Sequence, residues 1–244
     1  MKKHLIILTL FLLPFLSRAQ SSSDTIDLDA LVALDQMGET IGTLTSVTFH
    51  LSVVTDQLDE NNKLYSRPIE HEVTMVGPDK MLVKSFSLGR NRGYWYNGDH
   101  LTYYSFNENN YVTIPAPSNI MDMIEFMHTK FDMYFPAADF FYPSFTDDLL
   151  QDFKTITFKG EVNLGGHPCY ELYAENDKMT AQLWILAETY NLPKKFILTY
   201  KQKNNQKYEA IFSDWDLNPE VPDAIFDFTP PANAKLISVL LAKS

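Results

Sequence analysis

The stretch Val47-Thr48-Phe49-His50-Leu51-Ser52-Val53 alternates strictly between apolar and polar side chains. Successive side chains of a β-strand point to opposite faces, whereas those of a helix return to one face every three or four residues. The period of two therefore predicts a strand that is buried on one face and polar on the other.

A helical period precedes this strand. Apolar residues recur at helical spacing at Leu28, Leu31, Leu34, Met37 and Ile41. Asp27 suits the N-cap of such a helix and Gly42 suits its end, because a short polar side chain caps free backbone N–H groups and glycine tolerates the terminating conformation. We expect one amphipathic helix to open the fold.

Turn residues separate many strand-like segments after residue 53. Clusters of Asn, Asp, Gly and Pro punctuate two sets of segments, near residues 63–75, 81–88, 93–96, 100–106 and 111–114, and near residues 155–162, 167–174, 180–187, 195–203 and 206–215. Consecutive strands joined by short turns form an antiparallel meander. A sheet of about ten strands exposes an apolar face unless it curls and is covered, so the residues alone predict a large antiparallel α+β domain.

Several motifs near the C-terminal end carry a family resemblance. In chain order they are Gln182-Leu183-Trp184-Ile185, Leu192-Pro193-Lys194-Lys195, Phe212-Ser213-Asp214-Trp215, Phe226-Asp227-Phe228-Thr229-Pro230-Pro231 and Ala232-Asn233-Ala234. From about Leu28 to Ile237 the chain resembles an exported bacterial family of unknown function in the lipoprotein-carrier (LolA/LolB-like) superfamily. The resemblance implies an α+β fold with a large curled antiparallel sheet, an incomplete β-barrel, whose concave face is covered by helices. The family favours glycine where Asn233 stands, and asparagine is the next most tolerant residue of a positive φ.

The N-terminal residues predict export. Met1-Lys2-Lys3-His4 precedes an apolar run from Leu5 to Leu16 and then Ser17-Arg18-Ala19. This is the pattern of a cleavable signal peptide over residues 1–19, and the apolar run is short for the alternative, a transmembrane anchor. We expect a flexible leader at residues 20–26, one LolA/LolB-like domain at residues 27–244, and a soluble protein of the periplasm.

The charge of the chain limits its partners. It has 31 acidic and 20 basic residues, a formal net charge of -11. Such an excess repels phosphate backbones and anionic lipid surfaces, so we expect no nucleic-acid binding. Because the one apolar run is short for a bilayer, we also expect no stable membrane insertion.

The segment from Ile120 to Phe145 between the two strand sets is unusually rich in Met and Phe. Methionine is flexible and polarisable, so a Met/Phe-rich cover repacks around apolar guests of different shape. The alternative is that these side chains simply fill the core. The candidate ligand-binding residues here are Met123, Phe126, Met127, Phe131, Phe140 and Phe141.

Two tryptophans in strand-like sequence, Trp95 and Trp184, complete the candidate site. They would form a cavity wall, or alternatively pack on the sheet with the indole N–H hydrogen-bonded.

No catalytic pattern is visible in the sequence. A Gly-x-Ser-x-Gly elbow is missing, and His71-Glu72 lacks the second histidine of a zinc-protease helix. We therefore expect no catalytic residue, no metal site and no cofactor. The lone Cys169 is expected to be a buried apolar residue on a strand.

These observations lead to two functional hypotheses. The first is a non-catalytic periplasmic binding or carrier protein that holds a lipid, an acyl chain or a lipid-modified protein in an apolar cavity. The alternative is a module with a filled core that binds an envelope protein, for example through a free strand edge.

Overall fold

The computed structural model describes residues 25–188 and 190–238. The described residues contain three α-helices, α1 (Leu28–Gly42), α2 (Ile120–Phe131) and α3 (Phe145–Asp152), and two 3-10 helices, η1 (Ala138–Phe141) and η2 (Asp223–Phe226). The predicted signal peptide and residues 20–24 of the predicted leader lie outside the described residues. The leader prediction overlaps the structure at Thr25 and Ile26, which form a two-residue strand.

The described strands form one 13-stranded sheet. The first set is β2 (Ser46–Leu58), β3 (Leu64–Val76), β4 (Lys80–Phe86), β5 (Arg92–Tyr96), β6 (His100–Ser105) and β7 (Asn110–Pro115). The second set is β8 (Thr155–Leu164), β9 (His167–Glu175), β10 (Met179–Leu186), β11 (Pro193–Tyr200) and β12 (Gln206–Leu217). The two short strands β1 (Thr25–Ile26) and β13 (Lys235–Leu236) lie at the edges.

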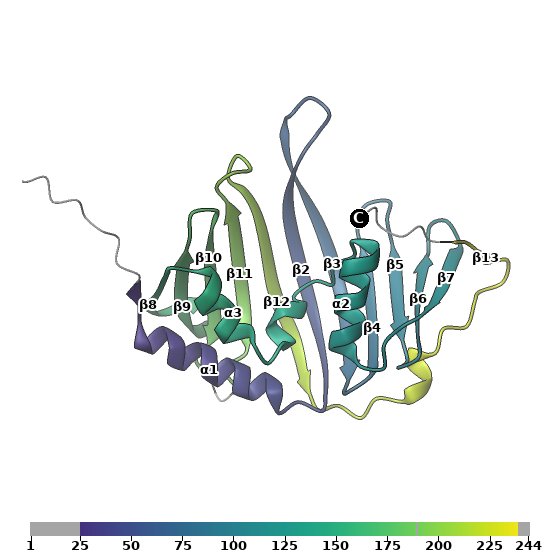
Figure 1. Cartoon of the computed structure of the whole chain (residues 1–244), viewed down its shortest axis with the longest axis horizontal. Coiled ribbons are helices and arrows are strands. Elements are labelled where there is room, and N and C mark those ends of the chain that lie inside the picture. Colours follow the sequence, from purple (N-terminus) through teal and green to yellow (C-terminus); the bar gives the residue numbers. More distant parts are fainter. Residues whose placement is uncertain (1–24, 189, 239–244) are drawn as a thin grey trace, which may run out of the picture.

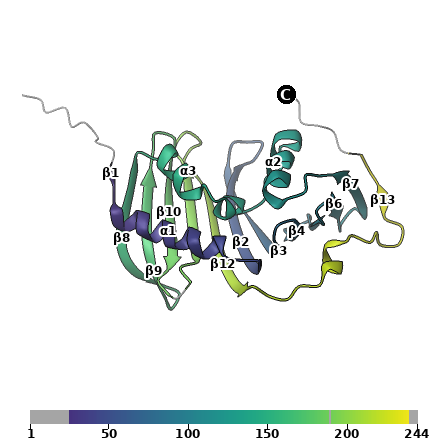
Figure 2. The same cartoon turned by 60° about the horizontal axis from the view of Figure 1, so that its bottom comes forward.

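The two meanders join in the middle of the sheet, where the last strand of the second set pairs with the first strand of the first set. The order is β1-β8-β9-β10-β11-β12-β2-β3-β4-β5-β6-β7-β13. Every pair is antiparallel except β1–β8 and β13–β7, so the two edges make the sheet a mixed one. The sheet is strongly curled and is not closed into a barrel (Figures 1 and 2).

Helices cover the concave face of the curl, as predicted. In both views α1 and α3 lie over the half made by β8–β12, whereas α2 lies over the half made by β2–β4 (Figures 1 and 2). One apolar core runs beneath all of them and includes Met37 of α1, Met123 of α2 and Phe212 of β12. The predicted α+β architecture is confirmed.

The turns lie where the clusters of Asn, Asp, Gly and Pro predict them. Asparagines at the predicted turns adopt the left-handed conformation, among them Asn62, Asn109 and Asn191. Asn233 also has a positive φ, of 60°, as expected from its place where the family favours glycine. The strand predicted to run to residue 203 stops at Tyr200, because a turn begins at Lys201.

The opening helix differs from its prediction in its buried stripe. Ala30, Ala33, Leu34, Met37 and Ile41 face the core, while Leu28 is 73% exposed. Asp27 occupies the N-cap position, but its side chain does not cap the helix. Instead, its Oδ2 accepts a hydrogen bond of 3.0 Å from the backbone N–H of Phe158, which ties the start of the helix to β8.

Candidate functional site

Three neighbouring strands form the floor of the candidate site. Phe49 of β2 pairs in register with Val73 of β3, which pairs with Val83 of β4. Two residues further along β3, Met75 pairs with Met81 of β4. Side chains of one parity share one face of a sheet, so these residues form two apolar rows on the concave face.

The cover of this floor is the segment from α2 to α3. Asn119 begins α2 by accepting a hydrogen bond of 2.8 Å from the Asp122 N–H, and Asp132 ends it in the left-handed conformation. Met123, Met127 and Phe140 of the cover are almost completely buried against the sheet. The cover thus presents large, flexible apolar side chains to the floor.

The attachment of the cover is apolar. Within the described chain, no hydrogen bond or ion pair joins residues 121–151 to the sheet or to α1. The backbone bonds of the segment stay within it, and the bonds to its surroundings lie at its two ends. At one end the Ile120 N–H donates to the Pro78 carbonyl, and at the other Asn176 Nδ2 donates to the Asp152 carbonyl. Side-chain packing alone therefore holds the middle of the cover down.

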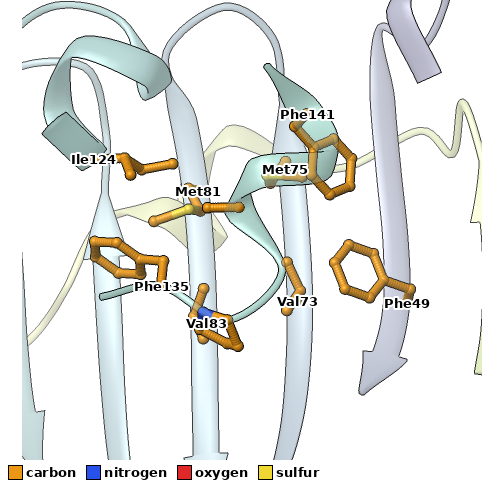
Figure 3. Close-up of a pocket in the computed structure, with 10 residues that line it drawn as sticks. Phe49, Val73, Met75, Met81, Val83, Ile124, Phe135 and Phe141 are labelled. Atoms are coloured by element: carbon orange, nitrogen blue, oxygen red, sulfur yellow. The ribbon is translucent and has the colours of Figure 1, made fainter. Parts of the chain in front are cut away.

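The space between floor and cover is small in this arrangement. A cavity of about 10 Å³ remains, and it is lined by Phe49, Val73, Met75, Met81 and Val83 from the sheet and by Ile124, Phe135, Pro136, Ala138 and Phe141 from the cover (Figure 3). A volume of about 10–15 Å³ is the least that admits one water molecule. The interior is therefore filled by the protein's own side chains while the cover is docked.

The structure brings together six of the eight predicted site residues. Met123, Phe126, Met127, Phe131, Phe140 and Phe141 all belong to the cover and pack into or against the core. Only Phe141 of these six lines the small cavity. The sequence did not identify the floor residues as site residues, although the alternation around Phe49 predicted that this face of β2 is buried.

The two predicted tryptophans lie on the other face of the sheet. Trp95 is flanked in β5 by Tyr94 and Tyr96, which point into the core, so its own side chain points to the convex face. There it packs on Phe228, with ring centroids 4.9 Å apart. Trp184 likewise lies between the core residues Leu183 and Ile185, and Lys195 Nζ lies 5.6 Å from its ring. Neither tryptophan contributes to a concave-face site, because alternation along a strand separates them from it.

The motif Phe212-Ser213-Asp214-Trp215 encodes a change of face. Strict alternation would place Phe212 and Trp215 on opposite faces, but the register of β12 with β2 shifts between Ser213 and Asp216. Asp214 adopts φ 54° at this bulge. Trp215 therefore returns to the core. There its ring stacks on that of Phe212, with centroids 5.3 Å apart, and its centroid lies 4.7 Å from that of the Phe49 ring.

A polar row follows the two apolar rows of the floor. His71, Ser85, Arg92, Ser105 and Asn110 pair in register across β3 to β7. His71 Nδ1 lies 2.8 Å from Ser85 Oγ. Burial, and secondarily the charge of His50, lowers the pKa of His71 to about 4, so that this imidazole is neutral at neutral pH.

A second hollow, of about 270 Å³, lies on the convex face. It is lined by Trp95, Asn97, His100, Thr102 and Thr113 and by Phe226, Asp227 and Phe228 of the C-terminal segment. Asn97 Nδ2 donates to Asp227 Oδ1 across it at 2.9 Å. Its mixed polar and aromatic lining differs from the uniformly apolar concave face. The described residues hold no group of three or more His, Cys, Asp or Glu side chains suited to a metal ion.

Comparison with known proteins places the chain in a family. The family model described as "Predicted periplasmic protein (DUF2092)" matches residues 30–240. The chain belongs to this family. Membership confirms the predicted resemblance to an exported bacterial family of unknown function. A search of curated proteins gives no match.

Several solved structures are similar to this DUF2092 protein at low sequence identity. An uncharacterized conserved protein from Thermus thermophilus is 12% identical, with a TM-score of 0.50, over 86% of this chain and 98% of that one. The lipoprotein LppX from Mycobacterium tuberculosis is 14% identical, with a TM-score of 0.47, over 81% and 99%. A LolA superfamily protein from Nitrosomonas europaea is 12% identical, with a TM-score of 0.35, over 82% and 97%. The likeness to the Thermus thermophilus protein, with a TM-score of 0.50, concerns the fold alone.

In the described part of the DUF2092 chain, no helix combines the length and the apolar character that crossing a bilayer requires. The longest, α1, has 15 residues, whereas a span needs about 20.

Proposed function

We propose that this protein is a non-catalytic periplasmic binding or carrier protein whose apolar concave face holds a lipid or acyl chain beneath a movable cover. The observation that carries the proposal is the attachment of residues 121–151, which rests on side-chain packing without a hydrogen bond or ion pair to the described sheet or α1. A segment held in this way lifts without breaking the backbone ladder beneath it.

The energetics favour reversible exchange between cover and ligand. Burial of each Met or Phe side chain of the cover stabilises the docked arrangement by about 1.5–3 kcal/mol. A twelve-carbon chain, at about 0.8 kcal/mol per buried CH₂, offers roughly 9 kcal/mol, comparable with a few such side chains. An acyl chain that takes the place of side chains such as Met127 or Phe141 therefore offsets part of the burial that the lifted cover loses. The filled interior corresponds to the closed, ligand-free arrangement.

The export prediction supports a periplasmic site of action. The family is described as predicted periplasmic, and we propose that residues 1–19 are a cleavable signal peptide and that the mature protein is soluble. In the aqueous periplasm a free acyl chain is poorly solvated, so a protein that encloses one lowers the free energy of its transfer.

The test is native mass spectrometry of mature protein purified from the periplasm, followed by lipid extraction and by titration with fatty acids and phospholipids. We expect a released lipid or a ligand-bound mass. Phe140→Ala, which weakens docking of the cover, should increase occupancy, since closed cover and ligand compete for the floor. Phe228→Ala, on the convex face, is the matched control and should leave occupancy unchanged. An unchanged apo mass in all three proteins would remove the proposal.

The filled interior favours one alternative, an interaction module for an envelope protein. This alternative also draws on the β2–β3 hairpin, which projects beyond its neighbours (Figure 1) and carries Leu58 and Leu64 at 39% and 46% exposure. Solvent-exposed apolar residues of this kind suit a protein contact. The apo mass that removes the carrier proposal would support this second candidate.

A further inference from the structure

The arginines of the described chain lie toward one end of the neighbouring strands β3, β4 and β5. Arg67 lies on β3, Arg90 in the turn after β4, and Arg92 at the start of β5. Arg67 Nη2 donates to Ser87 Oγ at 3.1 Å, and Ser87 Oγ donates to the Arg90 carbonyl at the same distance. Arg92 pairs in register with Ser85, two residues before Ser87. These arginines are up to 25 positions apart in the sequence.

Arg67 and Arg92 belong to the concave face. Every second residue of a strand points to the same face of the sheet. Arg92 therefore shares a face with Tyr94 and Tyr96, which pack into the core. On β3, Arg67 likewise shares a face with Ile69 and His71. Tyr94 contacts Phe135, with ring centroids 5.6 Å apart, and Phe135 lines the small cavity under the cover. Residues two apart on a strand are separated by about 7 Å. Arg92 therefore lies two residues beyond Tyr94, at the rim of the apolar floor, and Arg67 lies two residues beyond Ile69 on the same face of β3.

These arginines lack carboxylate partners. In the described part of the chain the ion pairs within 4.0 Å use lysine or histidine as the basic group, and none uses Arg67, Arg90 or Arg92. This is notable in a protein with 31 acidic and 20 basic residues. Their side-chain partners are neutral, because Arg92 is hydrogen-bonded to the side chain of Tyr94 and Arg67 to that of Ser87. Arginine forms paired hydrogen bonds with carboxylate and phosphate groups, so an arginine without a carboxylate partner beside an apolar floor is suited to an external anion.

The polar row supplies neutral partners beside the arginines. His71 and Ser85 continue the row on one side of Arg92, and Ser105 and Asn110 on the other. The buried Oδ1 of Asn110 has no hydrogen-bond partner, and its Nδ2 donates to Glu108 Oε2 at 2.8 Å. Because the carboxylate of Glu108 lies at the Asn110 end of the row, an anion is favoured away from that end, on the side of Arg92 that leads toward β3 and Arg67.

We infer that the ligand of the concave face is an anionic amphiphile, with its carboxylate or phosphate headgroup at Arg67 and Arg92 and its alkyl chain along the rows of Val73 and Met75. This inference rests on the proposed function and adds the chemistry of the headgroup. The acidic remainder of the surface then keeps the protein off anionic membranes, while the local pair of arginines selects the isolated headgroup.

The test compares three probes of equal chain length: dodecanol, laurate and dodecyl phosphate. Their affinities for the mature protein are measured by isothermal titration calorimetry below the micelle concentrations. Hydrogen bonds to charged groups are strong enough that we expect laurate or dodecyl phosphate to bind at least tenfold more tightly than dodecanol. The tighter of the two anions identifies the headgroup as a carboxylate or a phosphate, and either result supports the inference.

Variants separate the inference from the proposed function. Arg67→Gln/Arg92→Gln should abolish the preference for the anions over dodecanol. The matched control, Lys178→Gln/Lys207→Gln, removes two exposed positive charges elsewhere and should keep the preference. Circular dichroism and thermal unfolding verify that each variant folds. Equal binding of all three probes to the native protein overturns the inference alone, and binding of none overturns the proposed function together with it.

Discussion

Replacing Phe140 by alanine should release the cover from the sheet while the sheet stays folded. Phe140 is 6% exposed, and its ring contacts Phe145 of the cover and Phe196 and Phe212 of the sheet, with centroids 4.8, 5.2 and 5.5 Å apart. It therefore joins the cover to the sheet by aromatic packing at the centre of the core.

The size of the effect follows from this burial. Removing a fully buried phenylalanine ring costs about 3–5 kcal/mol. Because no hydrogen bond or ion pair holds residues 121–151 to the described sheet or α1, this cost falls on docking of the cover. The equilibrium between docked and lifted cover should shift by roughly 10²- to 10⁴-fold toward the lifted state.

Hydrogen exchange followed by mass spectrometry measures this shift. Peptides from α2 and α3 should exchange faster by up to that factor in Phe140→Ala, whereas peptides from β2, β3 and β12 should change little. Phe228→Ala, which removes a ring from the convex face, should leave exchange of α2 and α3 unaltered. The reasoning is refuted if the cover and the central strands accelerate together, because the cover would then unfold only with the whole sheet.

Three further predictions concern single residues. Asp214→Ala should destabilise the protein by about 1–2 kcal/mol in urea unfolding, because alanine disfavours the positive φ of the bulge, while Asp214→Gly should be nearly neutral; equal losses would show that the side chain matters more than the backbone. The lowered pKa of His71 means that the unfolded chain binds a proton more readily, so stability should fall by up to about 3 kcal/mol as the pH drops from about 6.5 to about 4. In the His71→Gln variant, the free energy of unfolding should no longer show this fall between about pH 6.5 and 4. If the variant and the native protein show the same pH profile, His71 is not its cause. Burial also raises the pKa of the Cys169 thiol, so a thiol reagent should modify the native protein far more slowly than the urea-unfolded one, and equal rates would contradict its burial.

Much of the fold and part of the candidate site were predictable because their signals are local. The alternation around Phe49 identified the strand, and asparagines such as Asn62 and Asn109 marked turns through their tolerance of positive φ. The Met/Phe content of residues 120–145 identified the segment that covers the sheet. Each of these signals needs only a few neighbouring residues, since backbone preference and side-chain period act over short distances.

The sequence by itself thus determined the strands, the turns and the apolar character of the cover. Tertiary structure alone decided that β12 pairs with β2, that the bulge at Asp214 returns Trp215 to the core, and that Trp95 faces away from it. It also brought Arg67 and Arg92 to one face of the sheet. The reason is that pairing between distant strands depends on the whole sheet, and a single bulge or register step moves a side chain to the opposite face.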